Sequence, residues 1–191
     1  MVEVTALSDN IFILKDFFTT PSVAFQKINE NGKAFLPGAL GIIFILSLFG
    51  FMDGVTVNSL FTFVWHIGST FVVAALVSYF GRSIYGGRGN YWGIFSCLGY
   101  THIFTIFSKF LGLIPGVSGF ILLPLALITL VLIIYFRLKA VSVSHGITMG
   151  QSFSTLLISG IVLFPVELGL HFFLEGSSSN IAGNAAKLIL K

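Results

Sequence analysis

Charged residues and cysteine are both scarce in this sequence. Lysine, arginine, aspartate and glutamate together make up 9% of its 191 residues, against about 25% in a typical soluble domain. The single cysteine, Cys97, excludes an internal disulfide, and no cysteine–histidine spacing typical of a zinc site is present. The net charge of +3 is too small to indicate a nucleic-acid partner. We therefore expect neither a disulfide-stabilised protein nor a nucleic-acid-binding protein.

Common catalytic motifs are missing as well. The sequence has no Gly-x-x-x-x-Gly-Lys-Ser/Thr loop for nucleotide phosphates and no His-Glu-x-x-His helix of a zinc protease. Ser96, Ser144 and Ser154 lack an acid–base partner at a spacing typical of nucleophilic catalysis. We therefore predict a protein that is not an enzyme and needs no cofactor or metal. A membrane-embedded enzyme stays as an alternative for which no substrate can be named.

Long apolar runs without charge are abundant. Five runs of 19 to 28 residues contain no charged residue: Ala34–Met52, Gly54–Gly81, Gly89–Ser108, Phe110–Phe136 and Ala140–Val166. A helix needs about 20 apolar residues to cross the hydrocarbon layer of a bilayer. The pattern predicts an all-α, polytopic integral membrane bundle of five transmembrane helices.

Turn-forming residues separate the predicted spans and mark where each begins and ends. Turns are expected at Asp53-Gly54, Gly81–Asn90 and Pro115-Gly116. The predicted spans are Ala34–Met52, Val57–Phe80, Tyr91–Leu113, Gly119–Phe136 and Thr148–Phe173. We expect an N-terminal segment over residues 1–33, the transmembrane domain over 34–174 and a short polar tail over 175–191.

The segment before the first span is amphipathic. Thr20-Pro21 is typical of a helix start, and Phe25 and Ile28 then lie on one face of the helix. We predict an interfacial helix that rests on the membrane surface with this face in lipid. The alternative, a helix packed under the bundle, stays open.

Lysine and arginine are divided unequally between the two sides of the membrane. With five spans, three of these residues fall on one side and seven on the other: Lys15, Lys27, Lys33, Arg82, Arg88, Arg137 and Lys139. The positive-inside rule then predicts a cytoplasmic N-terminus and a C-terminus outside. If Tyr91–Leu113 were re-entrant, four spans would place both termini in the cytoplasm.

The second loop and two further segments resemble a known family. Tyr85-Gly86-Gly87-Arg88-Gly89-Asn90-Tyr91, followed by Phe95–Tyr100, is similar to the prokaryotic branch of the Yip1 family. Pro21–Ile28 and Val143–Ser152 resemble the family's segments before the first and last spans, so the resemblance covers residues 20–175. It implies five spans, a cytoplasmic N-terminus and no catalytic residues. Eukaryotic relatives engage Rab GTPases through a longer N-terminal region, which this sequence does not show, so Rab binding is not implied.

The Gly81–Asn90 loop is the first candidate site. Its four glycines permit tight turns and close backbone approach, and its two arginines suit anionic headgroups or a partner protein. The candidate lipid- or partner-binding residues are Arg82, Tyr85, Gly86, Gly87, Arg88, Gly89 and Tyr91. The alternative, favoured over binding, is a tight reversal with positive-inside anchors.

Polar side chains inside the spans form the second candidate site. They are His66, Tyr100, His102, Glu167 and His171. From the outer ends of their spans, His66 lies about 13 Å deep, His102 about 16 Å and Glu167 about 9 Å, at 1.5 Å per residue. These depths allow the three to meet as a proton-relay or ion site. The alternative is interhelical hydrogen bonding, with Glu167 paired to His171 or Lys109.

Two functions follow from these sites. The first is a non-enzymatic membrane protein that organises membrane or binds lipid or protein partners through its cytoplasmic loops, alone or as a homo-oligomer. The alternative is a small transporter or channel that uses His66, His102 and Glu167. No inverted repeat supports the alternative.

Overall fold

The chain is helical throughout its regular structure. The computed structural model describes residues 12–51, 57–113 and 119–189, without the side chains of 50, 57, 58, 62, 119–121 and 171–189. All regular secondary structure in these ranges is helical, which confirms the predicted all-α class. After helical residues 12–19 come α2 (Pro21–Glu30), α3 (Gly32–Leu48), the 3₁₀ turn η1 (Phe49–Phe51), α4 (Val57–Tyr85), α5 (Tyr91–Thr101), α6 (Ile103–Gly112), α7 (Gly119–His145) and α8 (Met149–Ile189). The turns expected at Asp53-Gly54 and Pro115-Gly116 lie outside the described residues.

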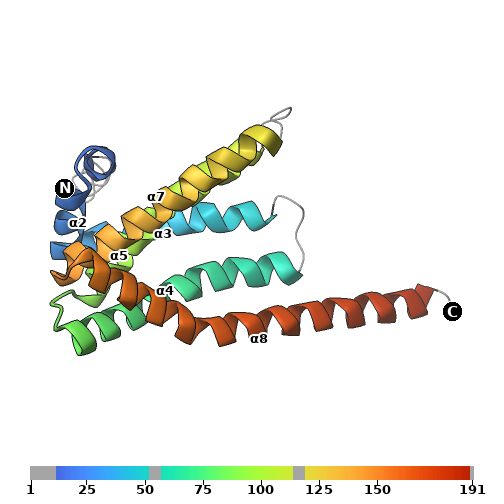
Figure 1. Ribbon diagram of the computed structural model, residues 1–191. Helices are drawn as coiled ribbons and strands as arrows, with labels where there is room; N and C mark the ends of the chain where they lie inside the picture. Colours follow the sequence, from blue (N-terminus) through green and yellow to red (C-terminus); the bar gives the residue numbers. More distant parts are fainter. Residues whose placement is uncertain (1–11, 52–56, 114–118, 190–191) are drawn as a thin grey trace, which may run out of the picture.

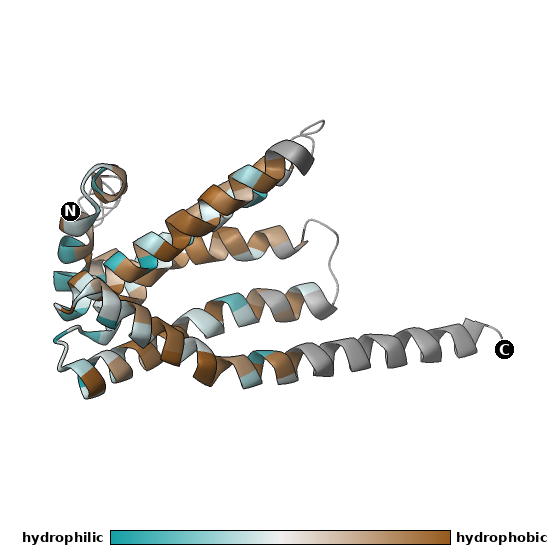
Figure 2. Ribbon diagram, in the orientation of Figure 1, coloured by the Kyte–Doolittle hydropathy of each residue, from teal (hydrophilic) through white to brown (hydrophobic). Residues whose placement is uncertain are grey.

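The long helices converge at one end of the molecule and diverge toward the other (Figure 1). We call the first the closed end; it holds α2, the loop 86–90 and the end of α7. The other is the open end. Hydrophilic residues concentrate at the closed end, whereas the diverging helices are mostly hydrophobic (Figure 2). This distribution suits a bundle whose closed end lies at a membrane surface.

Four helical stretches are long and apolar enough to cross a membrane. They are Ser59–Tyr85, Tyr91–Gly112, Leu122–His145 and Met149–Leu170. Most residues of three of them are not buried by protein, as lipid-facing helices require, whereas Tyr91–Gly112 is half buried. A fifth span results if α2 and α3, which are bent by 115° at their junction, are counted together. The chain is therefore a multi-pass membrane protein with four or five spans, and the predicted count of five stays a prediction.

The helix α2 is covered by protein on its apolar side. Ala24, Phe25 and Ile28 are fully buried, and the Phe25 ring packs edge-on against Phe136 of α7 at 6.2 Å. The ring centroid of Phe136 also lies 4.8 Å from that of Phe17, which belongs to the helical residues 12–19. The predicted interfacial helix in lipid is therefore not confirmed, because its apolar face packs under the bundle, as the alternative stated.

The helices α3 and α5 approach each other very closely. A Cβ added to Gly32 would overlap backbone atoms of Trp92 and Gly93, and one added to Gly99 would lie 2.7 Å from Ala39 Cβ. Ser96 also donates a hydrogen bond to the Gly32 carbonyl at 2.8 Å. Small residues at membrane helix contacts allow such approach, since packing rather than hydrophobic burial holds helices together in lipid.

One predicted helix end is wrong, and one helix continues beyond its predicted span. The helix α4 continues to Tyr85 rather than ending at Phe80, because Gly81 serves there to admit a neighbouring side chain and does not end the helix. The helix α8 runs to Ile189, past the predicted end of the last span at Phe173. The predicted third span, Tyr91–Leu113, corresponds to α5 and α6, which form one candidate span interrupted at His102.

Candidate functional site

The loop after α4 is held by hydrogen bonds on several sides. Arg82 donates from Nε to the Gly89 carbonyl at 2.8 Å and from Nη2 to the same oxygen. The Gly87 amide donates to the Gly81 carbonyl at 2.9 Å, and the Arg88 amide donates to the His145 carbonyl at 3.0 Å. The loop is therefore tied both to α4 and to the end of α7.

Asn90 joins this loop to two further helices. Its Oδ1 accepts from the Gly93 amide at 2.7 Å and caps the start of α5. Its Nδ2 donates to the Asn29 carbonyl at 2.7 Å, and Asn29 Nδ2 in turn donates to the Ser144 carbonyl at 3.3 Å. These bonds connect α2, α5 and α7, so the closed end is a continuous polar scaffold.

His145 lies at the centre of that scaffold among glycines. Its side chain is 2% exposed, and a Cβ at Gly81 or Gly87 would come within 2.5 Å of its ring. The Val77 carbonyl lies near the ring. Neither ring nitrogen meets hydrogen-bond geometry with any described group. The sequence analysis missed this residue; the signal available was the histidine that closes the fourth predicted helix together with the three glycines Gly81, Gly87 and Gly89.

The residues predicted to bind lipid or a partner are mostly used within the protein. Gly87 and Gly89 pack on His145, and Gly86 has a φ of 65°, a left-handed conformation that favours glycine. Tyr91 donates to the Phe71 carbonyl at 3.3 Å, and Tyr85 is half-buried. Both arginines are exposed, but Arg82 fastens the loop, whereas the Arg88 side chain is not part of these bonds. The geometry is that of a tight reversal that leaves two exposed cations.

Removing the Arg82 guanidinium is expected to destabilise the closed end. Arg82→Gln loses a two-pronged, charge-assisted bond to Gly89, so we expect the free energy of unfolding in mild detergent to fall by about 1.5 kcal/mol. Arg88→Gln is the matched control, because it removes the same charge from an equally exposed side chain of the same loop that does not bond to the Gly89 carbonyl. Equal losses for the two variants would contradict the structural role of Arg82.

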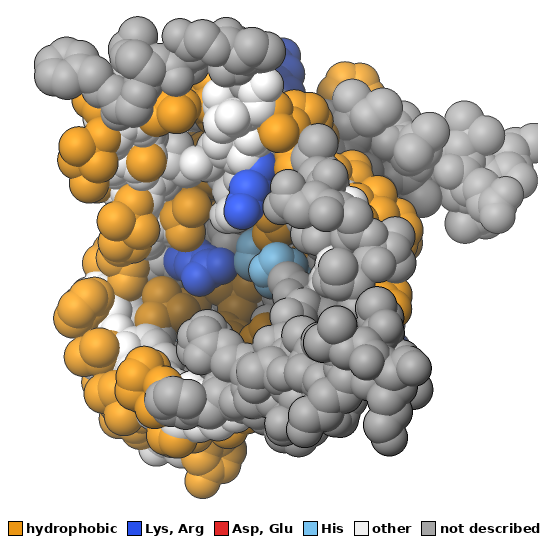
Figure 3. Space-filling model, turned by 90° about the vertical axis from the view of Figure 1, so that its right-hand side faces the viewer, with side chains coloured by type: hydrophobic (Ala, Val, Ile, Leu, Met, Phe, Trp, Pro, Cys, Tyr) orange, Lys and Arg blue, Asp and Glu red, His pale blue; other side chains and the backbone are white. Residues whose placement is uncertain are grey.

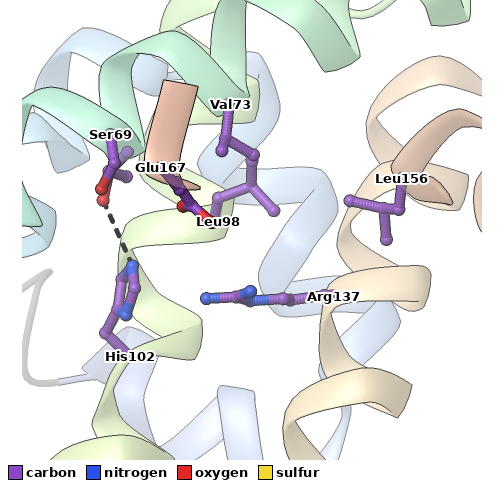
Figure 4. Close-up of a pocket in the computed structure, with 8 residues that line it drawn as sticks. Ser69, Val73, Leu98, His102, Arg137, Leu156 and Glu167 are labelled. Carbon is purple, nitrogen blue, oxygen red and sulfur yellow. Dashed lines mark hydrogen bonds between the residues drawn. The ribbon is translucent and has the colours of Figure 1, made fainter. Parts of the chain in front are cut away.

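A polar pocket of about 150 Å³ lies inside the bundle. Its lining comes from α4, α5, α7 and α8: Ser69, Thr70, Val73, Leu98, His102, Arg137, Leu156 and Glu167. Figure 4 shows Arg137 pointing toward the space between His102 and Glu167. The structure therefore brings His102 and Glu167 to one pocket, as their depths had suggested.

The position of His102 is fixed by a break in the helix and by Thr70. His102 separates α5 from α6, and its Nε2 lies 3.3 Å from Thr70 Oγ1. The Thr70 hydroxyl donates to the His66 carbonyl at 2.9 Å, so its oxygen is left to accept from His102. His66 thus supports the pocket through its backbone, while its buried Nδ1 has no partner among the described groups.

The other predicted members of the cluster lie elsewhere. Tyr100 is 1% exposed and faces the aromatic core, where its ring centroid is 6.4 Å from that of Phe17. Its assignment to the cluster is wrong, because a helical side chain two positions from His102 points to a different face. The side chain of His171 lies outside the described part. Glu167 has no cation within 4.0 Å among the described side chains, so its predicted pairing with Lys109 is also wrong.

Arg137 is the pocket residue that the sequence analysis missed. We expected Arg137–His145 to continue the fourth helix into water or the membrane interface. The helix α7 does continue for eight residues beyond Arg137 to His145, but Arg137 itself lines the pocket inside the bundle. This places Arg137 about 12 Å inside the helix end, at 1.5 Å per residue. Its recorded hydrogen bond runs from Nε to Thr101 Oγ1 at 3.5 Å. Viewed into the open end, basic and histidine side chains gather in a hollow framed by hydrophobic ones (Figure 3).

The arrangement of these side chains favours binding over metal chemistry. Among the described residues, no group of three histidine, cysteine or carboxylate side chains is close enough to hold a metal ion. The pocket instead combines one guanidinium, one imidazole, one carboxylate and two hydroxyls. Such a set can hold a polar ligand that carries charge.

Comparison with known proteins gives one match. No curated protein and no solved structure is significantly similar to the chain. The family model described as "Yip1 domain" matches residues 15–169, which include α2 through α7, the loop site, all intramembrane site residues except His171 and most of the apolar part of α8. The chain therefore belongs to the Yip1 family of membrane proteins.

Proposed function

We propose that this Yip1-family protein acts without catalysis, by organising membrane through contacts of its closed end with anionic lipid headgroups. The proposal rests on one observation: the closed end carries exposed basic and aromatic side chains on a hydrogen-bonded scaffold. Arg88 and Lys33 are exposed, and the side chain of Trp92 is 37% exposed. Lysine and arginine attract anionic headgroups, and tryptophan is enriched at the membrane–water interface.

The basic surface of the closed end contains a shallow groove. It lies between the α2–α3 junction and the start of α5, and Lys33, Asn90 and Trp92 are part of its lining. The other cation nearby, Lys27, is already paired with Asp16 at 2.7 Å. Lys33 is the cation of the groove lining and Glu30, which accepts a hydrogen bond from Gln26 at 2.9 Å, is its carboxylate. The excess of positive charge comes from Arg82 and Arg88, which are exposed in the adjacent loop. In the orientation that the positive-inside rule favours, this surface faces the cytoplasm.

The test measures attachment of a second membrane. The full chain in nanodiscs of phosphatidylcholine is mixed with liposomes that contain either phosphatidylcholine alone or added phosphatidylglycerol, and co-flotation is recorded. We expect binding to the anionic liposomes, weakened about tenfold in the double variant K33Q/R88Q and lowered by salt. K109Q, which removes a cation near the open end, is the control. Equal binding to neutral liposomes, or no effect of K33Q/R88Q, would reject the proposal.

A second candidate function is transport of a small charged solute. The specific observation in its favour is that His102 and Glu167 line one intramembrane pocket together with Arg137. Ionisable groups inside membrane spans often mark the path of a substrate or proton. A small solute would need this pocket alone, whereas a lipid would also need an apolar groove beside it.

A further inference from the structure

An apolar groove opens beside the polar pocket and shares four residues with it. The shared residues are Val73, Arg137, Leu156 and Glu167. The groove has a volume of about 390 Å³ and lies between α7 and α8, where it is further lined by Ile134, Leu138, Phe153, Leu157, Gly160 and Leu163. One molecule with a polar and an apolar part can therefore occupy both spaces at once.

The groove faces the surface that lipid covers. Ile134, Phe153 and Leu157 are 46%, 52% and 51% exposed. These side chains belong to helical stretches long and apolar enough to cross the membrane, so their exposed surface contacts hydrocarbon. A lipid chain can enter the groove sideways from the bilayer, without passing through water.

The positive charge at the head of this groove lacks a counter-ion. Arg137 forms no ion pair with any described side chain, and its recorded hydrogen bond to Thr101 is long, at 3.5 Å. A guanidinium has five N–H donors, so most of those of Arg137 have no hydrogen-bond partner among the described groups. Buried charges are normally paired, and arginine matches the oxygens of a phosphate group in particular.

A negative charge stands opposite in the same pocket. Glu167 lines both the pocket and the groove, yet it lies more than 4.0 Å from Arg137 and from every other described cation. Two opposite charges that face one cavity without meeting are complementary to a ligand that carries both charges itself. A carboxylate is stabilised best by a primary ammonium group, which donates hydrogen bonds, whereas a trimethylammonium group donates none.

We propose that the pocket and groove together hold one phospholipid with an amine headgroup, of the phosphatidylethanolamine type. Its phosphate binds the Arg137 guanidinium in the pocket, whose wall Ser69, Thr70 and His102 also form. Its ammonium group faces Glu167, and one acyl chain lies between α7 and α8. This site is separate from the headgroup surface proposed at the closed end, and neither requires the other.

The experiment identifies and counts the lipids that stay bound to the purified full chain. The protein is extracted in mild detergent, delipidated, and incubated with phosphatidylethanolamine, phosphatidylglycerol or phosphatidylcholine. Bound lipid is counted by native mass spectrometry. We expect one phosphatidylethanolamine per chain, retained about tenfold better than the other two lipids, and a loss of about tenfold in R137Q. E167Q should keep a bound lipid but lose the preference for phosphatidylethanolamine over phosphatidylglycerol.

Two substitutions keep the proposal testable if R137Q does not fold. A side chain at Gly160 or Gly169 of α8 meets nothing within 4 Å at its Cβ, and only Gly160 lines the groove. G160L should therefore reduce lipid retention by filling the groove, and G169L should not. K139Q is the charge control for Arg137 on the same helix.

Three results would overturn the proposal. They are equal retention of the three lipids by the unaltered chain, full retention by G160L, and thermal stabilisation by inorganic phosphate equal to that by phosphatidylethanolamine. The last result would favour a small anion in the pocket and hence transport. The K33Q/R88Q variant should retain lipid normally, so failure of the closed-end proposal would be recognised separately.

Discussion

Replacing Gly32 with alanine is expected to lower the free energy of unfolding by about 3 kcal/mol, at the upper end of what overpacking costs. The added Cβ would overlap the Gly93 amide nitrogen and the Trp92 carbonyl carbon, both of which are backbone atoms of α5. A side chain can rotate away from such an overlap, but a helix backbone cannot. The helices α3 and α5 would have to separate, and the Ser96 bond to the Gly32 carbonyl would be strained. Denaturant titration in mild detergent, followed by circular dichroism, measures the loss.

Gly41 provides the matched control on the same helix. A Cβ at Gly41 has nothing within 4 Å, so Gly41→Ala adds the same methyl group without a clash. Alanine is a better helix former than glycine by about 1 kcal/mol, and we expect no loss or a small gain. If Gly32→Ala unfolded at the same denaturant concentration as Gly41→Ala, the close contact between α3 and α5 would be disproved.

The helical membrane fold could be predicted because charge is costly in hydrocarbon. A run such as Phe110–Phe136 excludes most other environments, and α7 indeed covers most of it. The structural role of each glycine could be predicted less well. Gly81 and Gly86 look alike in the sequence, but Gly81 lies inside α4 and packs on His145, whereas Gly86 has a positive φ and begins the loop. Sequence spacing does not distinguish a glycine that ends a helix from one that admits a neighbour.

The depth of the pocket residues along their spans could be predicted from the sequence, but the direction in which each side chain points could not. Counting residues along each span placed His102 and Glu167 close enough to share a pocket, and they do. The same count included Tyr100, which turns away into the aromatic core. Arg137 was missed because a cation at the end of an apolar run usually marks the membrane surface. Its place inside follows from the pocket that α4, α5, α7 and α8 line together, which a residue count along one span does not show.

Substituting alanine for Gly81 is expected to cost about 2.5 kcal/mol, because the new Cβ would lie 2.5 Å from His145 Nε2. The ring has little room to move away. His145 is 2% exposed, and a Cβ at Gly87 would lie equally close to its other nitrogen. The substitution does not strain the backbone of Gly81, which is helical, so the loss measures the contact with the ring. Denaturant titration in mild detergent gives its size.

A double-mutant cycle with His145→Ala isolates this contact from other effects. His145→Ala alone should also destabilise the chain, since it leaves a cavity at the closed end. In the His145→Ala background, however, Gly81→Ala adds a methyl group to empty space and should be neutral or stabilising. The coupling energy between the two sites should then exceed about 1.5 kcal/mol, as for residues in direct contact. Additive losses would show that His145 does not fill the space between the glycines, and the closed end would lose its central support. A large coupling would mean that the glycines of the 81–89 segment serve to admit one histidine, so their role lies inside the protein and not in contacts with lipid or a partner.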